Sequence, residues 1–501
     1  MVKKTTRAKK PFFEGNEWTF PLLSEAIKHC EEIAVEELGL DCYPNQIEII
    51  NSEQMLDAYS SNGLPIMYKN WRFGKDFISM GKAYTKGEMG LAYEIVINSS
   101  PCISLLMEEN SMTMQTLVIA HAAFGHNHFF KNNELFREWT DADGILDYLK
   151  FAQNYVAKCE ERYGYEAVEK TLDAAHALQA QGVDRYRRPS PLTMIEERDR
   201  QEKRENELQK QINDLWITLP ANKEPQLKTK DSDYLYPNEE NLLYFLEKKA
   251  PLLQPWQREL LRINRKLAQY FYPNRQTKVM NEGFASFTHY YIMNRLWEKG
   301  LLSDGSMMEF LASHTAVLYS PTYQQGGFNP YALGFDIFDD IKRICEKPTP
   351  EDEEWFPDLA GKDWLTEIKY AAKTFRDESF ILQYLSPEIM RKRRMFLIED
   401  NAKENFFSIS KIHNSRGYKE IRSNLSKSYN ISYQQPDIQV EKVNFKDDRT
   451  LHLKHTMVNQ QRLDNSSLKA LKLLQELWGY KLILTSVDSS TGEQASTTLI
   501  E

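Results

Sequence analysis

The feature that most constrains the fold of this chain is a carboxylate and an imidazole set within an apolar helical stretch, residues 279–289 (VMNEGFASFTH). Glu282 and His289 are seven positions apart, about two turns of an α-helix, so both side chains project from one face. Phe284 and Phe287 fall elsewhere around the helix and can be buried. A charge buried beside them must be paired, so Glu282 and His289 are expected to have polar partners.

One interpretation is a hydrogen-bonded pair that only fixes helix packing. The other is a metal site, because a carboxylate and an imidazole are half of a usual ligand set for zinc or another divalent metal. A histidine-rich segment, residues 121–128 (HAAFGHNH), supplies candidates for the rest of that set, since it holds three of the ten histidines of the chain.

The spacing within this segment leaves two pairs open. His121 and His126 are five apart, about 140° around an unbroken α-helix, so they share a metal only with a local distortion. Gly125 permits such a distortion, through a bulge or a left-handed helix end. His121 and His128 share a face with no distortion at all.

Bulk properties narrow the class of protein. A chain of 501 residues exceeds one hydrophobic core and predicts two or three domains. A net charge of −9 gives no general attraction to nucleic acid or anionic lipid, and no apolar run approaches the roughly 18 residues that span a bilayer. The basic start lacks the apolar stretch of a signal peptide. Five scattered cysteines without a Cys-x-x-Cys motif indicate a reducing environment, so we expect a cytoplasmic protein.

Composition and periodicity divide the chain into five predicted parts. Residues 1–19 form a basic flexible tail, 20–190 an N-terminal α+β half of the core with the histidine cluster, and 191–238 a charged helical linker and loop. Residues 239–400 form a helical half with Glu282 and His289, and 401–501 a C-terminal domain. In the N-terminal half we predict helices over 20–62, interrupted at Pro44, a loop over 63–77 and a buried strand over 91–98.

The C-terminal part predicts strands at 406–410, 438–445, 450–458 and 480–487, with helices at 418–429 and 467–478. This order is the βαββαβ pattern of ferredoxin-like domains. The expected fold class is therefore mainly α with some β (α+β).

The sequence Asn-Glu-Gly-Phe-Ala at 281–285 resembles the helix that supplies the glutamate zinc ligand in gluzincin metallopeptidases of the aminopeptidase N type. Those enzymes carry two histidine ligands on an earlier helix, as His-Glu-x-x-His. The resemblance implies a helical metallopeptidase-like core, zinc as cofactor, and His121, His126 and Glu282 as its ligands. His289 would then stabilise charge or serve as a further ligand.

Ala122 stands where a zinc peptidase has the glutamate that activates water. Another carboxylate must then act as base, and Glu161 and Glu109 are the candidates, with Glu108 a rival. Further polar groups, Glu169, Asp173 and His176, share one helical face that is either solvated or turned inward to assist.

Many separate motifs, in order from about residue 20 onward, resemble the stage V sporulation protein R (SpoVR) family. They are YTKGEMGLAYEIVIN (84–98), MEEN (107–110), HAAFGHNHFFKNN (121–133), CEERYG (159–164), GVDRY (182–186), QTKVMNEG (276–283), NPYALG (329–334), WFPDLAG (355–361) and DESFI (377–381). The family pattern Tyr-x-His-Trp-Ser-x-Gly-Lys is altered at residues 68–75, where Asn70 replaces the histidine and Arg72 the serine. The resemblance implies a link to spore cortex formation or stress response, and association with a PrkA-type serine kinase and a von Willebrand-A-like protein.

Two functional hypotheses follow. The first is a cytosolic zinc-dependent hydrolase acting on an amide, in a peptide or a cell-wall precursor. The second is a non-catalytic regulatory or scaffold protein that acts with the kinase, its metal or polar cluster being structural.

Overall fold

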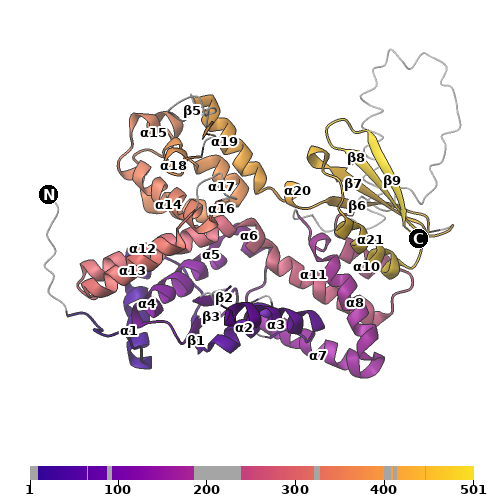
Figure 1. Ribbon diagram of the computed structural model, residues 1–501, viewed down its shortest axis with the longest axis horizontal. Helices are drawn as coiled ribbons and strands as arrows, with labels where there is room; N and C mark the ends of the chain where they lie inside the picture. Colours follow the sequence, from indigo (N-terminus) through magenta and orange to yellow (C-terminus); the bar gives the residue numbers. More distant parts are fainter. Residues whose placement is uncertain are drawn as a thin grey trace, which may run out of the picture. The chain divides into compact units, whose positions relative to one another are not determined.

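The computed structural model describes residues 10–61, 63–64, 66–86, 88, 93–185, 239–320, 328–395, 398–399, 408–409, 415–445 and 447–500. The chain forms two compact units, and neither is a continuous stretch. Unit 1 combines residues 1–165 with 270–434, and unit 2 combines residues 166–269 with 435–501. The α+β class is confirmed (Figure 1). The predicted linker, 191–238, lies outside the described residues, so the five-part division stays a prediction.

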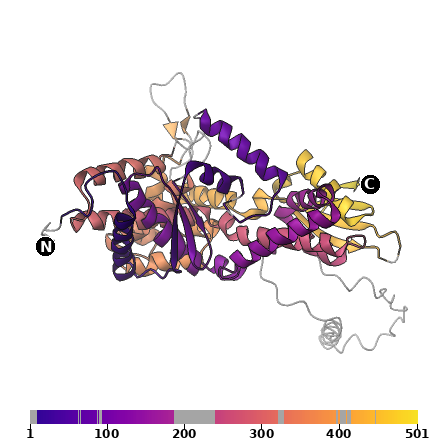
Figure 2. The ribbon, with the colours of Figure 1, turned by 90° about the horizontal axis from the view of Figure 1, so that it is seen from below.

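A three-stranded sheet lies within unit 1, with strand order β1-β3-β2 (Figure 2). The central strand β3 (Cys102–Met107) is buried along its whole length and pairs parallel with β1 (Asn45–Ile50) and antiparallel with β2 (Glu94–Ile97). The strand predicted over residues 91–98 therefore forms, as β2.

Two elements of unit 1 differ from the sequence prediction. The run predicted to be helical over 20–62 contains α1 (Phe20–Glu32), the π-helical η1 (Ile33–Glu37) and α2 (Ser52–Ser60), but β1 lies between them after Pro44. The second half of the predicted loop over 63–77 is helical, because α3 (Trp71–Thr85) begins there. The Asn70 side chain caps this helix by accepting a hydrogen bond from the Arg72 N–H, 3.0 Å.

Helices make up most of the rest of unit 1. In the first segment of unit 1, residues 1–165, they are α4 (Met112–Ile119), the π-helical η2 (Ala120–His126), α5 (Asn127–Asn132), α6 (Glu134–Trp139) and α7 (Ile145–Tyr163). In the second segment, residues 270–434, the helices are α12 (Lys278–Glu298), α13 (Asp304–Val317), α14 (Pro330–Glu346), α15 (Pro350–Trp355), α16 (Trp364–Thr374), α17 (Asp377–Tyr384), α18 (Pro387–Lys392), α19 (Ser415–Ser428) and α20 (Ile431–Gln434). Two short strands, β4 (Ile398–Glu399) and β5 (Ser408–Ile409), lie between α18 and α19. α12 packs against η2 and α14 and is buried over most of its length.

Glycines allow α12 to approach both of these neighbours. A Cβ atom on Gly125 of η2 would lie 2.7 Å from the Cα of Ala285, and one on Gly283 would lie 2.3 Å from the carbonyl carbon of Gly334 in α14. No other residue fits at these crossings without moving backbone. Glu282 is the residue before Gly283, so its backbone position is fixed by this packing.

The start of α12 is held by a buried carboxylate. Asp377, the first residue of α17, accepts hydrogen bonds from the backbone N–H groups of Val279 and Met280, each 2.9 Å. These N–H groups have no partner within the helix, so Asp377 provides hydrogen-bond acceptors for two buried donors that would otherwise have none.

Unit 2 contains α8 (Tyr165–Ala177), the 3-10 helix η3 (Gln179–Gln181), α10 (Leu242–Lys249), most of α11 (Pro255–Gln276), β6 (Asp437–Val443), β7 (Leu451–Met457), the 3-10 helix η6 (Val458–Gln460), α21 (Asn465–Trp478), β8 (Leu482–Asp488) and β9 (Gln494–Ile500). The strands form one sheet in the order β6-β7-β8-β9, in which only the central pair, β7 and β8, is parallel. α21 and α10 pack on this sheet through a second hydrophobic core (Figure 1).

This arrangement corrects the predicted βαββαβ order to ββαββ. The strand predicted at 406–410 is represented by β5, which pairs with β4 and not with this sheet. The strand β9 was not predicted, because its residues, QASTTLI, are mostly polar and exposed and lack the alternation that marks a strand in sequence. Among the helices that the structure describes, none is long and apolar enough to cross a membrane.

Candidate metal centre

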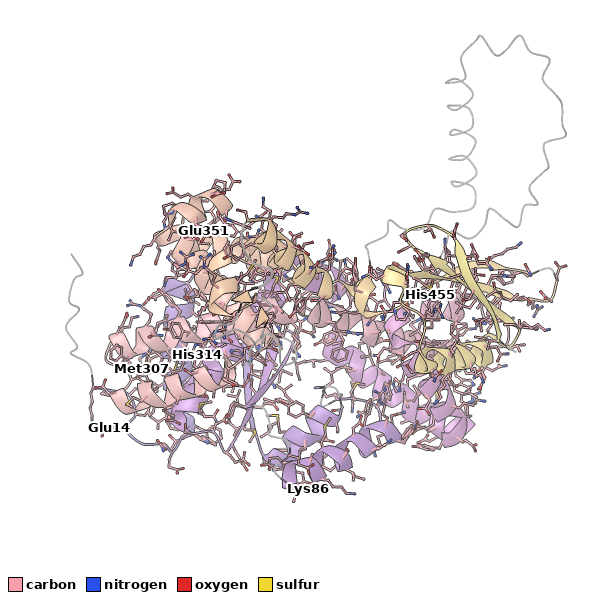
Figure 3. All side chains as sticks on the ribbon, turned by 45° about the horizontal axis from the view of Figure 1, so that its top comes forward. Glu14, Lys86, Met307, His314, Glu351 and His455 are labelled. Atoms are coloured by element: carbon pink, nitrogen blue, oxygen red, sulfur yellow. The ribbon has the colours of Figure 1, made fainter. Side chains whose placement is uncertain are left out.

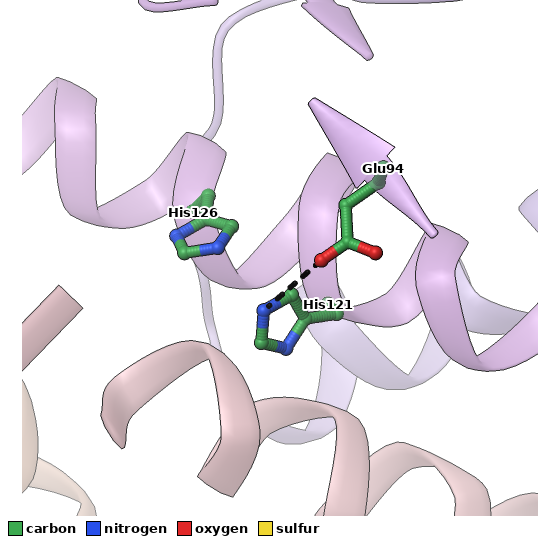
Figure 4. A group of neighbouring side chains, drawn as sticks. All are labelled: Glu94, His121 and His126. Carbon is green, nitrogen blue, oxygen red and sulfur yellow. Dashed lines mark ion pairs between the residues drawn. The ribbon is translucent and has the colours of Figure 1, made fainter. Parts of the chain in front are cut away.

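Three segments of unit 1 bring two imidazoles and two carboxylates together. Glu94 is the first residue of β2, His121 and His126 belong to η2, and Glu282 belongs to α12. The ligand atoms of Glu94, His121 and His126 all lie within 4.8 Å of one another (Figure 4). The closest approach in that group that joins a carboxylate to an imidazole is 3.6 Å, from His121 Nε2 to Glu94 Oε1.

Glu282 completes the cluster. Its Oε2 atom lies 3.8 Å from His121 Nε2 and 3.5 Å from His126 Nε2. Ligand atoms about 2.0 Å from a tetrahedral zinc ion are about 3.3 Å apart, so these separations are only slightly wider than a bound ion requires. Within the described chain, both His121 Nε2 and Glu282 Oε2 are buried and lack a hydrogen-bond partner. Buried polar atoms without a hydrogen bond are costly, and a cation between these two would satisfy both.

The π-helical backbone explains why His121 and His126 face the same point. In a π-helix the hydrogen bonds run from residue i to i+5, so side chains five positions apart are about one turn apart. The bulge that the sequence allowed is therefore present over residues 120–126. Gly125 contributes by admitting α12, and its φ angle is not left-handed, so the left-handed alternative does not apply.

Neighbouring polar groups orient both imidazoles. His126 Nδ1 lies 2.9 Å from the Asn281 side-chain oxygen, an acceptor, so Nδ1 carries the hydrogen and Nε2 presents its lone pair to the cluster. His121 Nδ1 shares a 2.9 Å hydrogen bond with His289 Nδ1, and His289 Nε2 shares one of 2.8 Å with His314 Nδ1. His289 therefore stands behind His121 and does not reach the cluster itself.

Burial and the charges within the cluster together set its protonation states. Burial lowers the pKa of His126 to about 4, which keeps the ring neutral. Burial also lowers the pKa of His121, but the carboxylates of Glu282 and Glu94 outweigh it and raise that pKa overall. Burial raises the pKa of Glu94. It raises that of Glu282 as well, but His121, His126 and the Tyr331 hydroxyl together bring the pKa of Glu282 below its ordinary value.

The alternative histidine pair does not form. His128 is buried on a different side of the helix, where its Nδ1 accepts a hydrogen bond from the Asp41 N–H at 2.9 Å and its ring stacks on Phe284. The two carboxylates predicted as bases are also elsewhere, since Glu161 is exposed on α7 and Glu109 is exposed in the turn after β3. Neither belongs to the cluster.

Sequence reasoning missed Glu94. It is the one charged residue in the apolar stretch 91–98 (LAYEIVIN). A lone carboxylate inside a buried strand needs a partner, and that was the available signal. The strand alone does not tell which face Glu94 occupies, because successive side chains point to opposite faces.

Known proteins and protein families match nearly the whole chain. The family model described as "SpoVR like protein" matches residues 17–434, and that of the "SpoVR-like C-terminal domain" matches residues 436–489. The "Uncharacterized protein YcgB" of Escherichia coli (strain K12) is 52% identical over 487 residues, which cover 97% of this chain and 94% of the relative. No solved structure matches.

Proposed function

The chain belongs to the SpoVR family, and from this premise we propose that it is a zinc-dependent hydrolase with its metal site in unit 1. His121, His126 and Glu282 are the proposed ligands. The observation that carries the proposal is the meeting of these donors around one point, with His121 Nε2 and Glu282 Oε2 both buried, close enough for ion pairs, and without a hydrogen bond in the described residues.

Glu94 is the proposed base in place of the glutamate that Ala122 does not provide. A zinc ion held by two histidines and a glutamate supplies Lewis acidity toward water and a carbonyl group. Glu94 Oε1 lies 3.6 Å from His121 Nε2, and the Glu94 side chain is 17% exposed, so water can reach it. Its carboxylate would accept a proton from the attacking water and return it to the leaving amine.

The proposed substrate is an amide, in a peptide or a cell-wall precursor, with a role in spore cortex formation or stress response. This part of the proposal rests on the family name and not on the site. Ala122 favours a second candidate function, in which the ion is structural and the protein regulates, together with a PrkA-type serine kinase and a von Willebrand-A-like protein.

Two carboxylate variants separate these functions. Glu282→Gln should lose the metal, because it removes a ligand that lies against both imidazoles. Glu94→Gln should keep the metal but lose hydrolysis of any amide that the wild type cleaves, by about 100-fold or more. Glu109→Gln is the matched control, since it changes an exposed carboxylate outside the cluster and should alter neither property.

The readouts are metal content by mass spectrometry and amide cleavage in a peptide and muropeptide library, with thermal unfolding to confirm folding. A protein that binds metal but cleaves no amide favours the regulatory function. Equal cleavage by wild type and Glu94→Gln would remove Glu94 from the mechanism.

A further inference from the structure

Helix α3 is not integrated into the core. None of its 15 residues is buried, although it packs on α2 and its Phe73 ring lies 6.1 Å from that of Tyr68. Two large apolar side chains, Trp71 and Ile78, are 49% and 59% exposed. An amphipathic helix with this much exposed apolar surface is a candidate interaction surface.

Three lysines form a stripe along the exposed side of α3. Lys75 and Lys82 are seven residues apart and Lys86 is four further on, so their side chains share one face. No carboxylate pairs with these lysines in the part of the chain that the structure describes, whereas Arg72 has Asp76 at 3.9 Å. In Figure 3, Lys86 lies at the end of α3, at the lower margin of the drawing.

The stripe is positive although the whole chain carries −9. Charges farther than about 10 Å are largely screened at 0.1 M salt, so an approaching surface responds to the local lysines. The low general affinity for anionic lipid expected from the net charge therefore does not apply to this face.

Apolar groups border the lysines. Ile78 lies next to the stripe around the helix, and a shallow open hollow of about 370 Å³ is lined by Phe77, Ile78, Gly81, Lys82, Thr85 and Lys86. Exposed tryptophan, isoleucine and lysine on one side of a helix are the residues found at the headgroup level of a membrane, where lysine stems lie along the acyl boundary.

We propose that α3 docks the protein reversibly on an anionic phospholipid surface, with Lys75, Lys82 and Lys86 on the headgroups and Trp71 and Ile78 at their depth. The stripe runs along one exposed helix about 22 Å long, and its lysines beside exposed tryptophan and isoleucine match the anionic headgroups and apolar boundary of a membrane surface. This docking is peripheral and independent of the metal site.

The test is flotation of the full chain with vesicles of phosphatidylcholine, with or without about 30% phosphatidylglycerol. At about 0.1 M salt, roughly tenfold more protein should float with the anionic vesicles, and about 0.5 M salt should abolish the difference. The triple variant Lys75→Glu/Lys82→Glu/Lys86→Glu should bind anionic vesicles no better than it binds neutral ones. Ile78→Ser should bind anionic vesicles more weakly than the wild type does.

The matched control is Lys28→Glu/Lys158→Glu/Lys373→Glu, which makes the same charge change at exposed positions of other helices. It should retain binding, and unchanged thermal unfolding shows that each variant is folded. Absence of vesicle binding by the wild type overturns the proposal. Equal loss in the control also overturns it, because binding would then follow net charge.

Discussion

His289 is central at the scale of single residues, because it stands between two other imidazoles. Its Nδ1 is hydrogen-bonded to His121 and its Nε2 to His314, and all three rings are buried. Such a group fixes the tautomer and the orientation of a metal-binding imidazole without touching the metal. We therefore assign His289 a positioning role.

Replacing His289 by Gln should weaken metal binding by about 10–100-fold without abolishing it, because His121 loses its orienting partner but keeps its place in η2. Competition with a chromophoric chelator measures this affinity. His128→Gln, at a buried histidine outside the cluster, should leave the affinity unchanged. Equal affinities of His289→Gln and wild type would show that His289 only fills space.

His128 predicts a pH dependence of stability that does not involve the metal. Burial lowers the pKa of His128 to about 4, from an ordinary value of 6.5. The unfolded chain therefore takes up a proton in this window while the folded chain does not, so stability falls as pH falls from about 6.5 toward 4. His128→Gln removes this contribution.

Urea unfolding with a chelator present provides the measurement. Between about pH 7 and pH 4.5, the wild type should lose about 2–3 kcal/mol more unfolding free energy than His128→Gln. Parallel losses in the two proteins would show that His128 is protonated in the folded state.

At the residue level, the sequence singles out residues whose chemistry is unusual for their surroundings. Glu282 and His121 stand out in sequence as polar groups in apolar segments, and both lie in the cluster. The choice of His126 over His128 depended on a π-helical backbone, and sequence periodicity assumes an α-helix. Glu94 depended on strand pairing, which joins residues far apart in sequence.

At the scale of elements, α12 owes its position to close backbone contacts. Gly283 meets Gly334 of α14, and Ala285 meets Gly125 of η2, so the helix carrying Glu282 has no room to move sideways. Close packing of this kind fixes the backbone position from which the Glu282 side chain reaches the cluster.

Gly283→Ala should destabilise the protein by about 1–3 kcal/mol, because the new methyl group forces α12 and α14 apart. Metal affinity should fall with it, since Glu282 is the adjacent residue. Gly81→Ala in α3 is the control: its Cβ meets nothing within 4 Å, so the change should stabilise the helix by about 0.5–1 kcal/mol. Thermal or urea unfolding distinguishes these opposite signs, and a neutral Gly283→Ala would contradict the packing argument.

Sequence patterns predicted the elements unevenly. Most long helices and β6, β7 and β8 follow strong periodicity and appear close to their expected places. Three elements were not predicted, each for a different reason. β1 lies in an apolar run next to helices, α3 begins in a stretch whose glycine and proline residues indicate a loop, and β9 is a mostly polar edge strand. β1 and β9 are stabilised mainly by pairing with neighbouring strands that the sequence does not reveal, whereas α3 begins at its Asn70 cap.

At the scale of the molecule, the proposed metal centre joins distant parts of the chain within unit 1. Residues 94–126 provide Glu94 and both histidines, and α12 provides Glu282. Between these segments the chain leaves unit 1 to build unit 2, which has its own core. A bound ion would therefore link the two halves of unit 1 and should raise its free energy of unfolding by RT ln(1 + L/Kd), where L is the concentration of free metal.

The most direct measurement is the metal content of protein purified without chelator and again after exposure to zinc, manganese or iron. We expect about one ion per chain, with zinc as the expected metal, in the wild type and in His128→Gln, and almost none in His126→Ala or Glu282→Gln. Folded wild-type protein that holds no stoichiometric metal after reconstitution, or a Glu282→Gln variant that binds it equally well, would contradict the central claim.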